Sequence, residues 1–424
     1  LKQIYDKGLL YKGYTIQPYS PKAGTGLSSH EVNQPGAYRD VTDTTIVAQF
    51  KTLPETLPSF LQGFGDIHIL AWTTTPWTLP SNTALTVGPK IDYVLLNGVT
   101  NQYTELESNL ILALDLVLKN LTHQQFEKWV VKEVLNGNHT GNDQGHVFDG
   151  FVETDGGIIP VEVKKINADS KTLTKFVNTC KDQGFSSGIF VCGAKSDKPE
   201  DFLDFNLKVI EFRDFKELLV EKELLFKGAD LVGIRYEQLL SYASPYQGAE
   251  NAFRVIAGDF VTTEDGTGIV HTAPTFGADD AKVAKEANPE VPPMLVLDEN
   301  GTPVPLVDLR GRFLPQVKDE IYGFANEYVK SEYLDEGEKE KDFTTQKEKL
   351  KDIISDLKAY LSVDERIALK LRKENKAFKV EKYVHSYPHS WRTDEPLLYY
   401  PLDSWFIKVT DVKDRMFDLN ETIN

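Results

Sequence analysis

Short apolar runs with the two-residue period of strands recur along most of the chain, separated by turns rich in Gly and Pro. In the first part of the chain we expect strands at residues 46–50, 67–72, 83–87 and 93–96. In the later part we expect strands at 228–236, 253–256, 260–263, 268–271 and 293–298, and a helix over 279–287.

Helical patterning is confined to a few stretches. Residues 2–10 favour a short helix, and residues 316–376 are rich in charge with Leu350, Ile353, Ile354 and Leu357 at helical spacing. This spacing predicts a solvated amphipathic pair of helices.

Composition indicates an ordinary globular protein. Of 424 residues, 41% are hydrophobic and 26% are charged, which fits two to four domains. No apolar run reaches membrane-spanning length and no signal peptide opens the chain. Two cysteines, Cys180 and Cys192, are too few for a disulfide framework. We therefore expect a cytoplasmic protein without a membrane partner. Because the sequence begins with Leu1 and not with Met, we also expect it to be an internal fragment of a longer protein.

The formal net charge of −17 argues against an extensive nucleic-acid-binding surface, because phosphate contacts favour Lys and Arg. It leaves room for a pocket that holds only the terminal nucleotide of an RNA.

Two motifs about two hundred residues apart carry the candidate chemistry. The first runs from Ala71 to Asn82 (AWTTTPWTLPSN) and ends an apolar strand in three threonines stopped by a proline. The second runs from Gly266 to Asp280 (GTGIVHTAPTFGADD). Threonine-rich strand ends are common, so the pair of motifs in this order is more informative than either motif alone.

This pair resembles the editing domain of the isoleucyl-tRNA synthetases, an insertion in a class I catalytic core that hydrolyses mischarged tRNA. Leucyl and valyl relatives typically carry Thr-Thr-Arg-Pro where this chain has Thr-Thr-Thr-Pro. The resemblance implies an α+β fold with a β-barrel-like editing domain. It also implies as partners the acceptor end of tRNA(Ile), valine as the aminoacyl group, and the remainder of a synthetase chain.

The resemblance also implies roles for individual residues. Asp280 would hold the α-ammonium, and His271 would lie beside the amino-acid side chain and help to exclude isoleucine. Helix capping is the commoner role for such aspartates, and we expect Asp279 to be the capping residue. The expected catalytic residues are Thr73, Thr74, Thr75 and Asp280, and the expected substrate-binding residues are Trp72, Asn82, His271 and Asp280.

The implied reaction is deacylation of valyl-tRNA(Ile) by a second sieve, for which isoleucyl synthetases are the standard illustration. Water is the expected nucleophile, because no Ser-His-Asp or Cys-His arrangement is present. Editing should need no cofactor and no metal. The His-x-Gly-His and Lys-Met-Ser-Lys-Ser signatures of aminoacylation are absent, so ATP would act only in a catalytic core outside this chain.

Residues 117–217 (the insertion) lie outside these motifs and resemble a small α/β domain of the restriction-endonuclease-like PD-(D/E)xK nucleases. They predict helix, hairpin, helix, strand, strand and helix, with Thr122 capping the first helix. Glu162 and Lys164 share one strand face by the two-residue period. The candidate site comprises Glu127, Asp149, Glu162 and Lys164, where carboxylates could bind Mg²⁺ while the lysine polarises water.

Three functions stay open: hydrolytic editing, Mg²⁺-dependent nuclease activity of the insertion, and binding of the tRNA acceptor end without catalysis. A purely structural insertion is an equally good reading, because an active nuclease would endanger tRNA. The expected segments are a link from the synthetase core (1–45), two parts of the editing domain (46–116 and 218–315), the insertion (117–217), a charged helical segment (316–376) and a return to the core (377–424).

Overall fold

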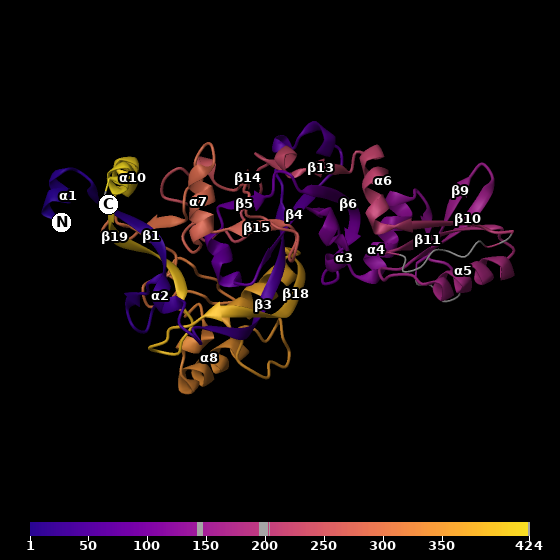
Figure 1. The fold of residues 1–424 in the computed structure, drawn as a ribbon. Helices are drawn as coiled ribbons and strands as arrows, with labels where there is room; N and C mark the ends of the chain where they lie inside the picture. Colours follow the sequence, from indigo (N-terminus) through magenta and orange to yellow (C-terminus); the bar gives the residue numbers. More distant parts are fainter. Residues whose placement is uncertain (142–146, 195–201, 203, 423–424) are drawn as a thin grey trace.

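Residues 1–141, 147–194, 202 and 204–422 are described by a computed structural model. Figure 1 shows an elongated molecule in which helices α1 (Lys2–Asp6) and α10 (Lys413–Glu421) lie together at one end. The insertion projects at the opposite end, and a large mixed sheet lies between them. Among the described residues, no helix combines the length and the apolar character needed to cross a membrane.

The central sheet contains nine strands within the described residues and has the order β13-β6-β7-β4-β15-β5-β14, with β3 pairing both β4 and β18. Parallel and antiparallel pairings are mixed along it, which is compatible with the predicted α+β class. Its strands are β3 (Tyr38–Lys51), β4 (Ile67–Thr73), β5 (Ala84–Val87), β6 (Asp92–Thr100), β7 (Glu107–Ala113), β13 (Leu225–Lys227), β14 (Arg254–Ala257), β15 (Ile269–Thr272) and β18 (Ala377–Pro388).

Strand β4 lies in the middle of this sheet, and its apolar sequence fits a strand that is covered on both faces. Along one edge it pairs with β3, and along the other it pairs first with β7 and then with β15. The 3₁₀ helix η3 (Pro76–Ser81) follows directly, with Pro76 at its first position, where the fixed φ of proline is favourable. The threonine motif therefore lies where β4 leaves the sheet.

One long antiparallel ribbon belongs to the central sheet, and a second lies outside it. One pairs β3 with β18, and the other pairs β1 (Leu10–Ser20) with β19 (Leu398–Ile407) near the two termini. A short strand, β2 (Thr25–Gly26), extends the second ribbon.

The insertion forms its own mixed sheet of five strands within the described residues, in the order β12-β11-β10-β9-β8. The hairpin strands are antiparallel, while β10, β11 and β12 are parallel to one another. The expected elements occur in the expected order, with the short strand β8 added before the hairpin. They are α4 (His123–Trp129), β8 (Asn138–His139), β9 (Gly150–Thr154), β10 (Gly157–Val163), α5 (Ser170–Asp182), β11 (Ser187–Cys192), β12 (Asn206–Glu211) and α6 (Phe215–Glu221).

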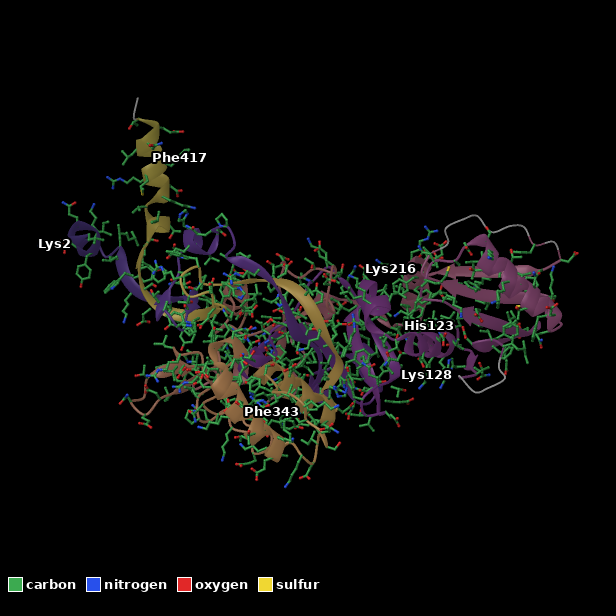
Figure 2. The ribbon with its side chains drawn as sticks, turned by 90° about the horizontal axis from the view of Figure 1, so that it is seen from below. Lys2, His123, Lys128, Lys216, Phe343 and Phe417 are labelled. Atoms are coloured by element: carbon green, nitrogen blue, oxygen red, sulfur yellow. The ribbon has the colours of Figure 1, made fainter. Side chains whose placement is uncertain are left out.

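Alternation along β11 explains how this sheet is covered. Ile189 and Val191 face the core that is continuous with the central sheet, whereas Phe190 and Cys192 face a separate cluster under α5. Thr122 caps α4 by accepting a hydrogen bond from the backbone N–H of Gln125, as predicted. Figure 2 shows His123 and Lys128 of α4 and Lys216 of α6 at the junction between the insertion and the central sheet.

The remaining elements cover the central sheet and the ribbons. They are α2 (Ser29–Val32), α3 (Val117–Asn120), α7 (Ala278–Glu286), β16 (Leu295–Leu297), β17 (Pro303–Pro305), α8 (Glu336–Lys349) and α9 (Val363–Lys373).

Two predicted strands were wrong. Residues 228–236 form a 3₁₀ turn and irregular chain, and residues 260–263 form no strand. The apolar side chains of Leu231, Ile234 and Tyr236 are buried, and the segment is joined to its neighbours by isolated β-bridges, Arg235 with Arg254 and Tyr236 with Thr52.

The predicted pair of helices is present as α8 (Glu336–Lys349) and α9 (Val363–Lys373), but Leu350, Ile353, Ile354 and Leu357 lie in the turns between them, because α8 ends at Lys349. The side-chain amide of Gln346 donates to the carbonyl of Leu361 and its oxygen accepts from the Leu361 N–H, which turns the chain back. The intervening apolar residues fold inward through turns.

The charged helical segment is attached to the threonine motif through a buried carboxylate. Asp364, in the first turn of α9, accepts a hydrogen bond from the backbone N–H of Trp77 at 2.7 Å. Burial raises the pKa of Asp364 to about 7, while the positive charge of Lys330 and the bond from Trp77 act in the opposite direction. The start of η3 is thus held by a helix nearly three hundred residues away.

We predict that Asp364→Ala lowers the free energy of unfolding by about 2 kcal/mol, because the buried N–H of Trp77 loses its acceptor. Asp364→Asn keeps an acceptor oxygen and should cost less than about 1 kcal/mol. Urea denaturation of both variants measures this difference. Equal losses for the two variants would show that the bond to Trp77 is unimportant.

Candidate functional site

The threonine motif and the second motif meet around one cavity of about 290 Å³. Strand β4 and the loop after it supply one wall, and β15 with the start of α7 supplies the other. The lining residues are Trp72, Thr73, Thr74, Thr75, Thr78, Val270, His271, Ala273, Phe276 and Asp280.

Hydrogen bonds among the threonines fix the first wall. The Thr73 hydroxyl accepts from the backbone N–H of Thr75 at 3.1 Å, and the Thr78 hydroxyl donates to the Thr75 carbonyl at 2.8 Å. The side-chain oxygens of Thr75 and Thr78 are 3.5 Å apart. These bonds form a tight turn after β4 that presents hydroxyl groups at the cavity.

His271 lies on β15 and is buried. Its Nε2 is 3.0 Å from the Thr78 hydroxyl, and its Nδ1 is 2.8 Å from the side-chain nitrogen of Asn82. Burial lowers the pKa of His271 to about 3, so the imidazole is neutral at physiological pH.

Asp280 supplies the acidic group of the cavity. Its Oδ2 accepts a hydrogen bond from the backbone N–H of Ala273 at 2.8 Å, which orients the carboxylate. Burial raises the pKa of Asp280 to about 6, the bond from Ala273 opposes this rise, and the charge of Asp279 adds to it. The carboxylate is ionised at neutral pH and can pair with a cation.

The expected capping role of Asp279 is wrong. Helix α7 begins at Ala278, and Gly277 is its N-cap residue without a side-chain hydrogen bond. Asp279 therefore lies inside the first turn, where its exposed carboxylate can interact with the positive end of the helix dipole.

The four candidate residues of the insertion also converge. Lys164 Nζ lies 2.7 Å from Glu162 Oε1 and 3.9 Å from Asp149 Oδ2. Asp149 directly precedes β9, and its Oδ2 accepts from the backbone N–H of Val163 at 2.7 Å. Glu127 on α4 is 7% exposed and lies 3.0 Å from His123 Nε2.

The pKa values in this cluster show that its charges interact. Burial raises the pKa of Glu127 to about 7, and the charge of Asp149 adds to this rise. Burial also raises the pKa of Glu162. For Lys164 burial lowers the pKa, but the ion pair with Glu162 outweighs it and the pKa is raised.

The carboxylates of this cluster are too few to enclose a metal ion completely. They could hold a Mg²⁺ ion that keeps several of its water ligands. Within the described residues, no three or more His, Cys, Asp or Glu side chains are grouped as a metal site. Mg²⁺ is commonly held by one or two carboxylates and retains several waters, which Asp149 and Glu162 could provide.

Comparison with known proteins identifies the family. The family model described as "tRNA synthetases class I (I, L, M and V)" matches residues 1–424. The chain belongs to the class I tRNA synthetases. The matched range includes residues 117–217, which the sequence motifs alone did not connect to the family.

Similar curated proteins are isoleucine–tRNA ligases. The ligase of Cytophaga hutchinsonii is 46% identical over 426 residues, that of Bacteroides fragilis 44% over 436, and that of Clostridium tetani 32% over 428. Each alignment covers all of this chain but only 29%, 29% and 25% of the respective relative. The chain thus spans less than a third of the length of these relatives.

Among solved structures, the P. knowlesi cytosolic leucyl-tRNA synthetase editing domain is 13% identical, with a TM-score of 0.29, and the match covers 59% of this chain and 64% of that one.

In this class I synthetase chain, most predicted editing residues line the same cavity. The exception is Asn82, which is 1% exposed and lies behind His271, so it can reach the cavity only through that ring. Prediction from sequence missed the lining residues Thr78, Val270, Ala273 and Phe276. All four lie inside the two motifs, so motif membership was the signal that could have found them.

Proposed function

We propose that the cavity between the two motifs hydrolyses valyl-tRNA carrying the isoleucine anticodon. The supporting observation is the meeting of the threonine wall and the Asp280 carboxylate around a single small cavity. The choice of tRNA(Ile) as the tRNA that carries the valine rests on the Thr-Thr-Thr-Pro form of the motif and on the names of the similar ligases. The acceptor end of tRNA and the rest of a longer synthetase chain are the proposed partners.

Asp280 is the proposed ligand of the substrate's α-ammonium. A carboxylate in a partly buried site binds an ammonium more strongly than one in water, since the local dielectric constant is lower. The bond from Ala273 leaves the second carboxylate oxygen of Asp280 available to the ligand.

The threonine wall is the proposed binding surface for the terminal adenosine and the ester. Hydroxyls that are already ordered by mutual hydrogen bonds hold the ester at little further entropic cost. Water then adds to the ester carbonyl, the carbon–oxygen bond to the ribose breaks, and the ribose oxygen regains a proton. The products are free valine and tRNA.

Selectivity would come from size. Valine and isoleucine differ by one methylene group, which a single binding site distinguishes only weakly, so a second small cavity improves accuracy by admitting valine alone. The reaction needs no cofactor, and ATP would be used only by a catalytic core elsewhere in the protein. The proposed compartment is the cytoplasm.

A non-catalytic acceptor-end-binding module is a competing function for the same cavity. Parallel deacylation assays on valyl-tRNA and isoleucyl-tRNA separate the two, because a binding module would retain tRNA without releasing the amino acid.

A second candidate function, Mg²⁺-dependent nuclease activity, is favoured by the convergence of Asp149, Glu162 and Lys164 in the insertion. The two carboxylates would hold the cation, which would supply electrostatic stabilisation at the scissile phosphate. Lys164 would orient the attacking water, and Glu127 would add a further carboxylate to the outer part of the site. A purely structural insertion is the alternative that the assay must exclude.

We predict that Asp280→Asn lowers kcat/KM for deacylation of valyl-tRNA about 30-fold, because the ionic contact to the ammonium is lost. The amide still accepts a hydrogen bond from Ala273, so the fold should be retained. Asp279→Asn is the matched control, since this neighbouring carboxylate is exposed and does not line the cavity. Similar rates for both variants would exclude the role given to Asp280.

We also predict a pH dependence from the same carboxylate. Because the pKa of Asp280 is about 6, kcat/KM should fall as the pH drops through that value, reaching about one tenth at pH 5. In Asp280→Asn this fall should disappear. Rates corrected for uncatalysed ester hydrolysis between pH 5 and 8 measure both profiles.

For the insertion, we predict that any Mg²⁺-dependent cleavage of plasmid or tRNA is lost in Lys164→Ala. Lys171→Ala, an exposed lysine on α5, is the control and should cleave like the parent protein. Gel assays with Mg²⁺ or with EDTA measure the effect. No cleavage by the parent protein would leave the insertion with a structural role.

A further inference from the structure

The orientation of the Asn82 side chain is fixed by a backbone group. Its Nδ2 lies 2.8 Å from the carbonyl oxygen of Ala84, and a carbonyl can only accept a hydrogen bond. The amide nitrogen must therefore face Ala84, and the amide oxygen faces the Tyr236 hydroxyl at 2.7 Å and accepts its proton.

This orientation determines the protonation of one ring nitrogen of His271. The same Asn82 Nδ2 lies 2.8 Å from His271 Nδ1 and 3.4 Å from the carbonyl oxygen of Thr272, so its second N–H points at the nearer acceptor, the ring nitrogen. Nδ1 must accept this bond and cannot carry a proton. A proton there would bring two donors together in a buried site, which costs the desolvation of both groups.

The other ring nitrogen is fixed from the opposite side. His271 Nε2 lies 3.0 Å from the Thr78 hydroxyl, and that hydroxyl donates its own proton to the Thr75 carbonyl at 2.8 Å. The hydroxyl oxygen is then an acceptor for Nε2–H. The hydrogen bonds thus form a series from Ala84 through Asn82, His271 and Thr78 to Thr75. The backbone carbonyls at its two ends can only accept, so they set the donor and acceptor of every bond between them.

We propose that Tyr236 and Asn82 are positioning residues that hold His271 as the neutral Nε2–H tautomer, so that the ring is an apolar wall of the editing cavity and not a general base. With both nitrogens bonded to protein groups, only carbon atoms of the ring remain to face the amino-acid side chain. The inference rests on the proposed editing function for its role in selectivity, whereas the tautomer itself follows from the hydrogen bonds.

Two further observations support this role. Tyr236 is 2% exposed, and burial raises the pKa of its phenol, so the hydroxyl keeps the proton that it donates to Asn82. His271 is held on β15 between β4 and β5, which prevents the ring from moving away from the cavity.

The tautomer can be measured directly by NMR of the protein labelled with ¹⁵N-histidine, with the His271 signals assigned by their loss in His271→Gln. We expect Nδ1 to show the chemical shift of an unprotonated acceptor and Nε2 that of an N–H group at pH 7. A protonated Nδ1 or a cationic ring would overturn the proposal. This outcome does not depend on whether the protein deacylates tRNA.

Asn82→Asp tests whether the Asn82 amide determines which ring nitrogen of His271 carries the proton. A carboxylate cannot donate to Nδ1, so the proton should move to Nδ1 and the pattern of shifts should reverse. An unchanged pattern in a folded variant would show that Asn82 does not set the tautomer. If this variant does not fold, the wild-type spectrum remains a complete test of the tautomer.

Tyr236→Phe tests the role in selectivity. Removing the phenol frees the Asn82 amide to move, and the ratio of valyl-tRNA to isoleucyl-tRNA deacylation should fall up to about tenfold. Tyr242→Phe is the matched control, because its hydroxyl bonds Asp319 and does not contact Asn82 or His271. An unchanged ratio in Tyr236→Phe would overturn the positioning role. If the parent protein itself deacylates neither tRNA, the proposed function is contradicted instead.

Discussion

Parallel pairing of Trp72 with Val270 is the constraint that creates the cavity. These residues lie on β4 and β15, about two hundred positions apart in the sequence, and their pairing places the threonine turn beside His271. A shift of one residue along either strand would move every side chain to the opposite face of the sheet, so the register decides which groups line the cavity. Antiparallel pairing of β15 with β5 then fixes His271 opposite Leu85. The geometry of the cavity is therefore a consequence of strand register more than of any side-chain contact.

Within that frame, His271 and Asp280 use their polar atoms in different ways. Neutral His271 has both ring nitrogens occupied, while Asp280 uses one oxygen on Ala273 and stays ionisable with a pKa of about 6. The ring nitrogens of His271 are therefore occupied by protein groups, whereas the carboxylate of Asp280 can bind a cation. Asp364 does not line the cavity. It accepts a hydrogen bond from the backbone N–H of Trp77 and so stabilises the turn after the threonines.

The strands nearest the site could be predicted from sequence because their signals were local. The β4 run is apolar and bounded by Pro76, and the predicted residues 67–72 agree with the observed Ile67–Thr73. The convergence of the two motifs came from family resemblance, since no local pattern reports a pairing over two hundred residues. The hydrogen bond of Tyr236 to Asn82 could not be predicted from the sequence. The sequence predicts Tyr236 in a strand over 228–236, whereas in the structure it forms an isolated β-bridge with Thr52 and its buried hydroxyl donates to Asn82.

The insertion can be accommodated without disturbing this register because of where it leaves and rejoins the sheet. The last residue of β7, Ala113, pairs with Tyr93 on one side of β6, and Phe226 of β13 pairs with the same tyrosine on the other side. The two ends are thus separated by two strand spacings, about 10 Å, which a compact domain can span without strain. The Tyr93 hydroxyl donates to the carbonyl of Gly268, just before β15, so the point of attachment is itself fixed to the strand that carries His271. A domain of about a hundred residues can therefore project from the end of the molecule while the geometry of the cavity is kept.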